Sequence, residues 1–327
     1  MASFERILVT GGAGFVGSHM SAALAKAYPQ AALLILARPG ETGVPAHASR
    51  IEADLVDEAA MDRLVAQHKP DLVVHLAGQS SIGEASKAAE QTWRVNFHGA
   101  FGLGAAIARH APRALVLFSS SATVYGLSYR DGVLDETAPV RPLEAYGRSK
   151  VAAEFALGDV LGEESRLIIA RPVNHSGPGQ RSSHFVLASF ASQIAAIEAG
   201  VAPPKLQVGE LSRARDFLDV RDVVDAYMRL IAAADAWPDR VSVFNVASGQ
   251  AYTIAAILEE FRRRARVGFD VEVDPARLRP SSIDIPSIAC DASKLRQATG
   301  WRPRYPLGDL VQALLDECRA AHADGRA

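Results

Sequence analysis

A tyrosine and a lysine spaced for proton transfer stand near the middle of the chain. Tyr146 and Lys150 lie four residues apart, so on a helix their side chains share one face, one turn apart. A free tyrosine phenol titrates at about 10, and a neighbouring ammonium favours the phenolate and lowers that pKa. Such a pair can pass a proton to or from a carbonyl or alcohol oxygen. On spacing alone, the two residues are better interpreted as an ordinary surface tyrosine and lysine. A catalytic role for the pair therefore depends on the residues that surround it.

Hydroxyl side chains cluster at the end of a predicted strand. The segment SSSATVYG begins at Ser119, where the apolar run Ala114–Ser119 ends. Hydroxyls in this place emerge at the carboxyl edge of a parallel sheet, where open α/β sheets bind ligands. A serine-rich strand end that merely caps the next segment is the alternative, but the proton-transfer spacing would then be a coincidence. The expected catalytic residues are Ser121, Thr123, Tyr146 and Lys150.

A glycine-rich turn separates the first predicted strand, Arg6–Thr10, from the first predicted helix. It reads TGGAGFVG, with glycines in the spacing G-x-x-G-x-x-G. Glycines in this place let backbone N–H groups approach a pyrophosphate at the positive end of a helix. Strand, turn and helix agree, so dinucleotide binding is favoured over a merely structural turn. The expected contacts here are Gly11, Gly14, Phe15, Val16 and Gly17.

The end of the second predicted strand, Ala32–Ala37, bears on which dinucleotide fits. An acid there holds the ribose 2′-hydroxyl of NAD, whereas an arginine nearby accommodates the 2′-phosphate of NADP. Arg38 follows the strand, and no carboxylate comes immediately after it. A surface arginine at a strand end is the plain alternative. We favour NADP, with NAD as the other candidate, and expect Asp54 and Leu55 to line the adenine site, although Asp54 also suits a helix cap.

The elements that must position these residues alternate between apolar strands and helices. Continuous apolar strands with intervening helices are typical of a parallel sheet covered on both faces. We predict an α/β fold, a doubly wound parallel sheet of the Rossmann type with a smaller C-terminal α/β lobe. The expected division is a dinucleotide-binding domain over residues 1–172 and a substrate lobe over residues 173–327, with about 217–247 returning to the sheet. Further predicted strands are Asp71–Ala77, Arg166–Ala170 and Val241–Val246, and the longer predicted helices are Val16–Tyr28, Glu58–His68, one around Ala85–Arg109, Ala145–Gly158, Phe185–Ala199, Arg221–Ala233, Thr253–Arg264 and Asp291–Thr299.

Composition excludes several functions. The 327 residues include 35 Lys and Arg against 37 Asp and Glu, a net charge of −2, so no bulk positive field attracts nucleic acid or anionic lipid. Two cysteines, Cys290 and Cys318, exclude a disulfide scaffold and fit a reducing cytosol. We find no zinc-type Cys/His spacing, no apolar run of about 20 residues and no leader-like amino terminus. We therefore expect a cytoplasmic protein with no metal, nucleic-acid or membrane partner.

Together these motifs resemble the extended short-chain dehydrogenase/reductases, also described as NAD-dependent epimerase/dehydratases. The resemblance covers essentially the whole chain and includes Asn96 in the segment VNFHG. It implies that Ser121 holds the substrate oxygen, that Tyr146 is the acid or base, and that Lys150 steers Tyr146 and holds the nicotinamide ribose. Asn96 would lie under the floor of the active site. The further cofactor contacts implied are Leu76, Ala77, Gln79, Asn96, Ser119, Arg171 and Val173.

Several segments look like the substrate side of family members that act on nucleotide sugars. These are RPVNHSGPGQ after the strand Arg166–Ala170, RDFLDVRDV from Arg215, and the pair Arg279-Pro280. Two arginines suit a diphosphate, because a guanidinium donates two parallel hydrogen bonds to its oxygens; Arg215 as a surface residue is the alternative. Asp284 stands two residues later than the ribose-binding acid of the family pattern. The implied substrate contacts are Ser80, Ser121, Asn174, Arg215, Arg279 and Asp284.

The resemblance also bears on the reaction. Dehydratases of this superfamily carry an acid where Ala122 or Thr123 stands here, and threonine cannot replace a carboxylate as a general acid. The segment Ser-Ala-Thr fits an epimerase and a reductase equally. The motifs look most like the GDP-sugar reductases of the family, which implies NADPH-dependent reduction of the C4 ketone of a nucleotide-linked 4-keto-6-deoxyhexose, from GDP-4-keto-6-deoxy-D-mannose to GDP-D-rhamnose, with Tyr146 as proton donor. A 4-epimerase with tightly bound NAD, a GDP-mannose 4,6-dehydratase and a non-catalytic Rossmann sensor are the alternatives. The family likeness further implies a homodimer, formed through the helices around Ala85–Arg109 and Ala145–Gly158.

Overall fold

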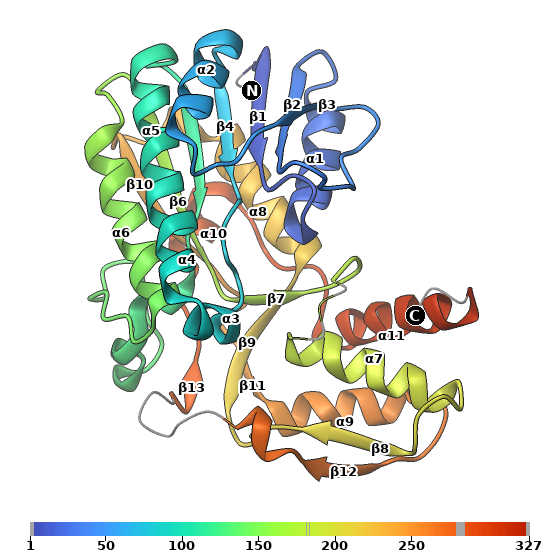
Figure 1. Cartoon of the computed structure of the whole chain (residues 1–327). Helices are drawn as coiled ribbons and strands as arrows, with labels where there is room; N and C mark the ends of the chain where they lie inside the picture. The colour runs from blue at the N-terminus through green and yellow to red at the C-terminus, as the bar shows by residue number, and fades with distance from the viewer. Residues whose placement is uncertain (1–2, 181, 183, 279–284, 325–327) are drawn as a thin grey trace.

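A parallel sheet forms the centre of the molecule (Figure 1). The computed structural model describes residues 3–180, 182, 184–278 and 285–324. Seven strands pair in the order β10-β6-β5-β4-β1-β2-β3, each parallel to its neighbours. They are β1 (Arg6–Thr10), β2 (Ala32–Ala37), β3 (Ser49–Glu52), β4 (Leu72–His75), β5 (Leu115–Ser119), β6 (Arg166–Pro172) and β10 (Val241–Val246). The α/β, Rossmann-type fold predicted from the sequence is therefore confirmed.

Helices cover both faces of this sheet, because its strands are apolar on both sides. In β1, Leu8 packs into one core while Ile7 and Val9 pack into the other. The first core is covered by α2 (Glu58–His68), α5 (Gly99–His110) and α6 (Ala145–Val160). The second is covered by α1 (Phe15–Ala27), α8 (Val220–Ala232) and α10 (Ser293–Thr299).

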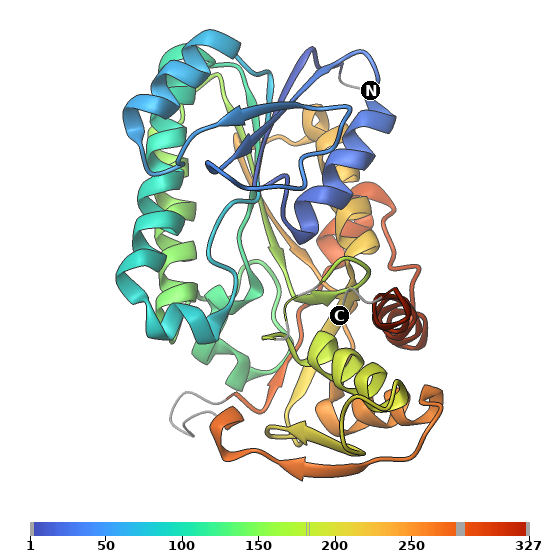
Figure 2. The same cartoon turned by 45° about the vertical axis from the view of Figure 1, so that its right-hand side comes forward.

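A smaller lobe lies beyond the carboxyl edge of the sheet (Figures 1 and 2). Its strand β9 (Ala214–Asp219) pairs with β7 (Asn174–Ser176), β11 (Ala251–Thr253) and β13 (Ser287–Ile288), while β8 (Lys205–Val208) pairs with β12 (Asp270–Val273). The helices α7 (Val186–Glu198), α9 (Ile254–Arg264) and α11 (Leu307–Ala323) enclose a third hydrophobic core, which contains Leu206, Ile257, Phe261 and Leu314. The division of the chain at residue 172 stays a prediction.

The prediction of one long helix around Ala85–Arg109 was wrong, because the helix is interrupted. The segment forms α3 (Ile82–Lys87), α4 (Ala89–Trp93), a π-helical turn at Arg94–His98 and then α5. Ala88 leaves the helical region, with φ −129° and ψ 58°. A π turn inserts extra backbone and so turns the following side chains about the helix axis. In this turn Asn96 becomes buried. No helix in the described part of the chain is long and apolar enough to span a membrane.

Candidate active site

One cleft of about 1760 Å³ runs from the carboxyl edge of the sheet into the lobe. The glycine-rich turn and the ends of β2, β4 and β5 line one arm, and β7, β9 and α7 line the other. Most residues predicted from the sequence meet here, although they come from distant parts of the chain. They are Gly11, Gly14, Phe15, Val16, Gly17, Arg38, Asp54, Leu55, Leu76, Ala77, Gln79, Ser80, Ser119, Ser121, Thr123, Tyr146, Lys150, Val173, Asn174 and Arg215.

Ser121 and Tyr146 meet where β5 ends and α6 begins. The Ser121 hydroxyl caps the 3₁₀ turn that begins at Ala122: its oxygen accepts from the Thr123 N–H (3.2 Å) and from the Thr123 hydroxyl (2.9 Å). With both Thr123 donors aimed at it, Ser121 keeps its own proton to donate. Burial raises the pKa of Tyr146, and a hydrogen bond with Ser121 acts in the opposite direction. The phenol is therefore protonated at neutral pH.

Lys150 follows Tyr146 by one turn of α6 and lines the same cleft. Its Nζ donates to the carbonyl oxygen of Ser119 (2.8 Å) and lies 4.8 Å from the ring centre of Phe118. Burial lowers the pKa of Lys150 to about 8, and the charge of Glu154 acts in the opposite direction. Burial is the largest influence on the pKa of Tyr146 and raises it, so the expectation that Lys150 lowers this pKa stays a prediction.

Asn96 does not line the cleft but supports one of its walls. The side chain is 1% exposed. Its oxygen accepts from the Gln79 N–H (2.7 Å), and its amide donates to the Gln79 carbonyl (3.2 Å) and to Ser149 Oγ (3.1 Å). Asn96 therefore ties the strand end after β4 to helix α6. This places Asn96 behind the described lining of the cleft, and its implied contact with the cofactor stays a prediction.

Arg171, which the family resemblance implies as a cofactor contact, lies behind the described wall of the cleft. It is absent from the described lining of the cleft and is 7% exposed. Its guanidinium donates to both carboxylate oxygens of Glu154 (3.0 and 2.6 Å) and to the Tyr125 hydroxyl (3.1 Å). Ser120 donates to the same carboxylate. Arg171 thus braces the strand end that carries the catalytic hydroxyls from behind.

The glycine-rich turn fits the diphosphate of a dinucleotide. Gly11 has φ +70°, and a Cβ there would lie 2.8 Å from the Ala77 nitrogen; a Cβ on Gly17 would lie 2.0 Å from the Gly11 carbonyl. Glycine at position 11 therefore lets the turn approach the strand end after β4, and glycine at position 17 lets α1 pack against the turn. A Cβ on Gly14 would meet the Gly11 carbonyl at 3.2 Å, and among the described residues no side chain caps this end of α1. The first-turn N–H groups are thus available to an anion in the cleft.

The turn after β2 holds a residue that sequence reasoning missed. Glu41 lines the cleft beside Arg38; its carboxylate accepts from the Arg38 N–H (2.9 Å) and pairs with the Arg38 guanidinium (3.4 Å). The Pro39-Gly40 pair was the available signal, because such pairs mark turns that fold the chain back. Asp54 also lines the cleft, and the capping alternative does not hold for it, since Asp57 is the residue that caps α2.

The lobe contributes a basic wall to the other arm of the cleft. Arg215 on β9 donates to the carbonyls of Ala214 (2.8 Å) and Ile285 (3.0 Å). Arg213 and Arg277, which the sequence prediction did not name, also line this arm. The predicted substrate contacts Arg279 and Asp284 lie outside the described residues. Within the described residues, no group of three or more His, Cys, Asp or Glu side chains is arranged to hold a metal ion.

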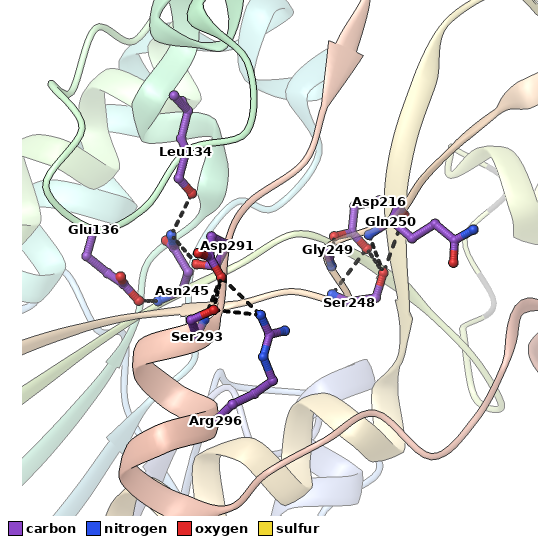
Figure 3. A network of polar contacts seen from close by, with 10 residues as sticks. All are labelled: Leu134, Glu136, Asp216, Asn245, Ser248, Gly249, Gln250, Asp291, Ser293 and Arg296. Carbon is purple, nitrogen blue, oxygen red and sulfur yellow. Dashed lines mark hydrogen bonds and ion pairs between the residues drawn. The ribbon is translucent and has the colours of Figure 1, made fainter.

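Two buried polar side chains, Asp216 and Asn245, are each at the centre of a group of hydrogen bonds (Figure 3). Asp216, next to Arg215, accepts from the Ser248 hydroxyl (2.6 Å) and the Gly249 N–H (2.9 Å), which ties β9 to the loop after β10. Burial raises the pKa of Asp216 to about 6, against these hydrogen bonds. Asn245 on β10 donates to the carbonyls of Leu134 and Asp291, both at 3.1 Å. The Asp216 contacts hold the arginine-bearing strand β9 against the loop after β10, and the Asn245 contacts join β10 to the segments around Leu134 and Asp291.

Comparisons with known proteins agree with this geometry. A family model described as GDP-mannose 4,6 dehydratase matches residues 8–314. The chain is 35% identical over 315 residues to GDP-6-deoxy-D-mannose reductase of Pseudomonas aeruginosa, covering 96% of this chain and 97% of that one.

Two solved structures share the fold. The structure of RMD from Pseudomonas aeruginosa complexed with NADPH superposes with a TM-score of 0.80 at 31% identity, covering 97% and 99% of the two chains. A UDP-glucose-4-epimerase from Stenotrophomonas maltophila, with bound NAD and formylated UDP-arabinopyranose, superposes with a TM-score of 0.82 at 26% identity, covering 98% and 99%. The family resemblance inferred from the motifs is confirmed. The chain belongs to the family described as GDP-mannose 4,6 dehydratase, within the extended short-chain dehydrogenase/reductases, and is an enzyme of that group.

Proposed function

We propose that the protein reduces the C4 ketone of a nucleotide-linked 4-keto-6-deoxyhexose with NADPH, converting GDP-4-keto-6-deoxy-D-mannose into GDP-D-rhamnose. The similarity to a GDP-6-deoxy-D-mannose reductase supports the substrate class, and the NADPH complex of a similar structure supports the cofactor. In the cleft, the glycine-rich turn would hold the cofactor diphosphate, and the basic wall that includes Arg215 would hold the diphosphate of the sugar nucleotide.

The chemistry of the site residues follows from their contacts. A bound NADPH supplies hydride to the carbonyl carbon. Ser121, whose oxygen is already engaged by Thr123, donates a hydrogen bond toward the ketone oxygen, where negative charge develops. Tyr146 gives its phenolic proton to that oxygen, which completes the alcohol. Lys150, held by the Ser119 carbonyl, places a positive charge near the phenolate that remains.

The similarity of the chain to a GDP-6-deoxy-D-mannose reductase is the observation that carries this proposal. Reduction of a ketone needs a proton donor, and the Tyr146 phenol, whose pKa burial raises, can serve as one. Ala122 and Thr123 stand where a dehydratase carries an acid, so the site lacks that carboxylate for removing water from the sugar. Reduction is therefore the reaction that the site supports best.

The test is a Tyr146→Phe variant, assayed by NADPH consumption with GDP-4-keto-6-deoxy-D-mannose. We expect a rate at least about a hundredfold lower than that of the wild type, because a positioned general acid contributes about that much. Tyr252→Phe removes a phenol outside the cleft and should leave the rate unchanged. A loss smaller than about threefold in Tyr146→Phe would reject Tyr146 as the proton donor. Tightly bound NAD that survives purification would indicate the 4-epimerase instead, and release of a keto sugar from GDP-mannose without added cofactor would indicate the dehydratase.

We also propose a homodimer formed through α5 and α6. Phe101 on α5 and Phe155 on α6 are 42% and 65% exposed, so a second copy of the chain packed on these helices would cover apolar surface. Light scattering of the purified protein measures the mass that tests this.

A further inference from the structure

One peptide group in the loop after β7 is held from two distant parts of the chain. Its carbonyl, on Pro178, lies 2.7 Å from Nε2 of His19 on α1. Its N–H, on Gly179, donates to the Glu317 carboxylate on α11 (2.7 Å). A carbonyl oxygen only accepts, so His19 Nε2 carries the hydrogen of the first contact. Two helices that are far apart in the sequence therefore bind the two ends of a single amide.

The loop that contains this peptide group borders the cofactor arm of the cleft. Residues 174–180, which we call the strap, follow β6 and pass between α1 and α11 (Figures 1 and 2). Asn174 and Gly179 of the strap line the same cleft as Gly11 and Gly14 of the glycine-rich turn. The strap and the turn therefore face the same space.

An aromatic ring of the glycine-rich turn packs against the strap. The Phe15 ring stacks on His175 of the strap, with the ring centres 6.3 Å apart and the planes 13° apart. The His19 ring meets Phe15 edge-on, at 6.0 Å. Gly179 has φ +90°, and a Cβ on it would lie 3.8 Å from both His19 and Phe15. The strap thus rests on the first turn of α1, the helix end that suits a diphosphate.

We propose that the Pro178-Gly179 peptide group is a clamp that keeps the strap closed beside a bound nicotinamide dinucleotide, with His19 and Glu317 as its positioning residues. This rests on the cofactor part of the proposed function. Release of a dinucleotide from the glycine-rich turn requires the strap to move away from α1. Because α11 packs in the third hydrophobic core with α7 and α9, the clamp also couples the lobe to the retention of cofactor.

Each partner of the clamp should slow the release of cofactor. Glu317→Ala removes the acceptor for the Gly179 N–H and should raise the dissociation rate of NADPH by about fivefold, with little change in the association rate. His19→Ala removes the donor to the Pro178 carbonyl and should raise the dissociation rate by about threefold. Glu317→Gln keeps a neutral acceptor, which is weaker than a carboxylate, so its rate should lie between those of the wild type and Glu317→Ala.

The double variant distinguishes a clamp from two separate contacts. Once one end of the peptide group is free, the other hydrogen bond no longer holds the strap in place. The variant that combines His19→Ala with Glu317→Ala should therefore release NADPH little faster than Glu317→Ala alone. Two independent contacts would instead give effects that multiply.

The experiment is stopped-flow fluorescence on the purified full-length protein without sugar substrate, in which bound NADPH, and in a parallel series NADH, is chased with excess oxidised cofactor. Asp316→Ala is the matched control, because it removes a carboxylate from the neighbouring position of α11 that contacts Gln312 and Arg319. Its rate should stay within about twofold of the wild type. Thermal unfolding without ligand checks that each variant is folded, and Glu317→Gln carries the test if Glu317→Ala is unstable.

The outcomes separate the clamp from the proposed function. Faster release in both single variants, with a double variant close to the faster of the two, supports the clamp. A rate within about twofold of the wild type in either single variant overturns the clamp, and so do effects that multiply in the double variant. These results leave the proposed function standing, whereas a wild type that binds neither NADPH nor NADH overturns both.

Discussion

Two arginine–glutamate pairs in this molecule have the same chemistry and opposite surroundings. Arg171 and Glu154 pair behind the catalytic strand end, with side chains 8% and 6% exposed, whereas Arg38 and Glu41 pair at the rim of the cleft, 76% and 27% exposed. Burial decides what each pair can do. A buried charge that loses its partner has no water to replace it, so the first pair is a fixed brace. At the rim, water or a ligand phosphate can replace either partner, so each residue of the second pair can leave the other and bind a ligand instead.

The brace belongs to a chain of buried polar contacts. Ser120 donates to Glu154, Arg171 joins Glu154 to the Tyr125 hydroxyl, and Tyr125 donates to Asn245 on β10 (2.7 Å). The chain links the strand that bears the catalytic hydroxyls to the edge strand of the sheet. Most of its members support the catalytic strand end from behind, and the cofactor contact expected of Arg171 stays a prediction.

The largest effect is expected from breaking the buried pair. Arg171→Leu leaves Glu154 charged in an apolar interior and should lower the free energy of unfolding by about 3–5 kcal/mol. Arg113→Leu, which breaks the exposed pair with Glu164, should cost less than about 1 kcal/mol. Urea unfolding measures both. If both variants lost equally little free energy of unfolding, burial would not make the Arg171–Glu154 pair more important for stability than an exposed pair. The contrast drawn here would then be wrong.

The sequence predicted the sheet well because its signal is local. Apolar runs and helical periodicity placed α2 and β2 at the observed bounds. The spacing of the glycines in the turn after β1 indicates where the backbone must pack closely. The Tyr146–Lys150 pair lies within one helix, so its spacing is also visible in the sequence. These features depend on residues close together in the chain, so pattern reasoning reaches them.

The rest depends on partners that the fold supplies. Glu154 stands 17 residues before Arg171, and nothing in the segment around Arg171 shows that a carboxylate from α6 will reach its guanidinium. Glu41 reaches the cleft through a turn, so a search for an acid directly after β2 passes over it. The interruption at Ala88 likewise has no propensity signal, because alanine is the best helix former. Tyr146 was expected to have a low pKa from its neighbour Lys150, but the sequence does not show how deeply the fold buries the phenol.

A second effect concerns the pH dependence of activity. Lys150 has a pKa lowered to about 8 by burial, while the charge of Glu154 raises it. The other nearby groups are His75, neutral because burial lowers its pKa to about 3, and Arg171, which is held on Glu154. Activity that needs the ammonium should fall as pH rises through about 8. Glu154→Gln removes the charge that keeps Lys150 protonated, so the alkaline limb of the kcat/KM profile should move to lower pH.

The control for this shift is Glu164→Gln, which removes an exposed carboxylate far from the cleft and should leave the limb in place. A limb that stays fixed or moves to higher pH in Glu154→Gln would show that the brace does not act on Lys150. The Arg171–Glu154 pair would then hold the strand end in place without influencing the pKa of Lys150. The two pairs would differ only in how much they contribute to stability.

The smallest effect on stability is expected at the rim, and it completes the comparison. Without ligand, Glu41→Gln should change the free energy of unfolding by less than about 1 kcal/mol, because the pair is exposed and its charges are hydrated when separated. With saturating NADPH the same variant should gain more thermal stability than the wild type, because a ligand stabilises the folded state in proportion to the logarithm of its affinity. Arg38→Ala should gain less than the wild type. Thermal unfolding with and without NADPH measures all three. If Glu41→Gln without ligand loses as much stability as Arg171→Leu, the Arg38–Glu41 pair is also a structural brace. Exposure would then not be the property that lets an ion pair give up its partner for a phosphate.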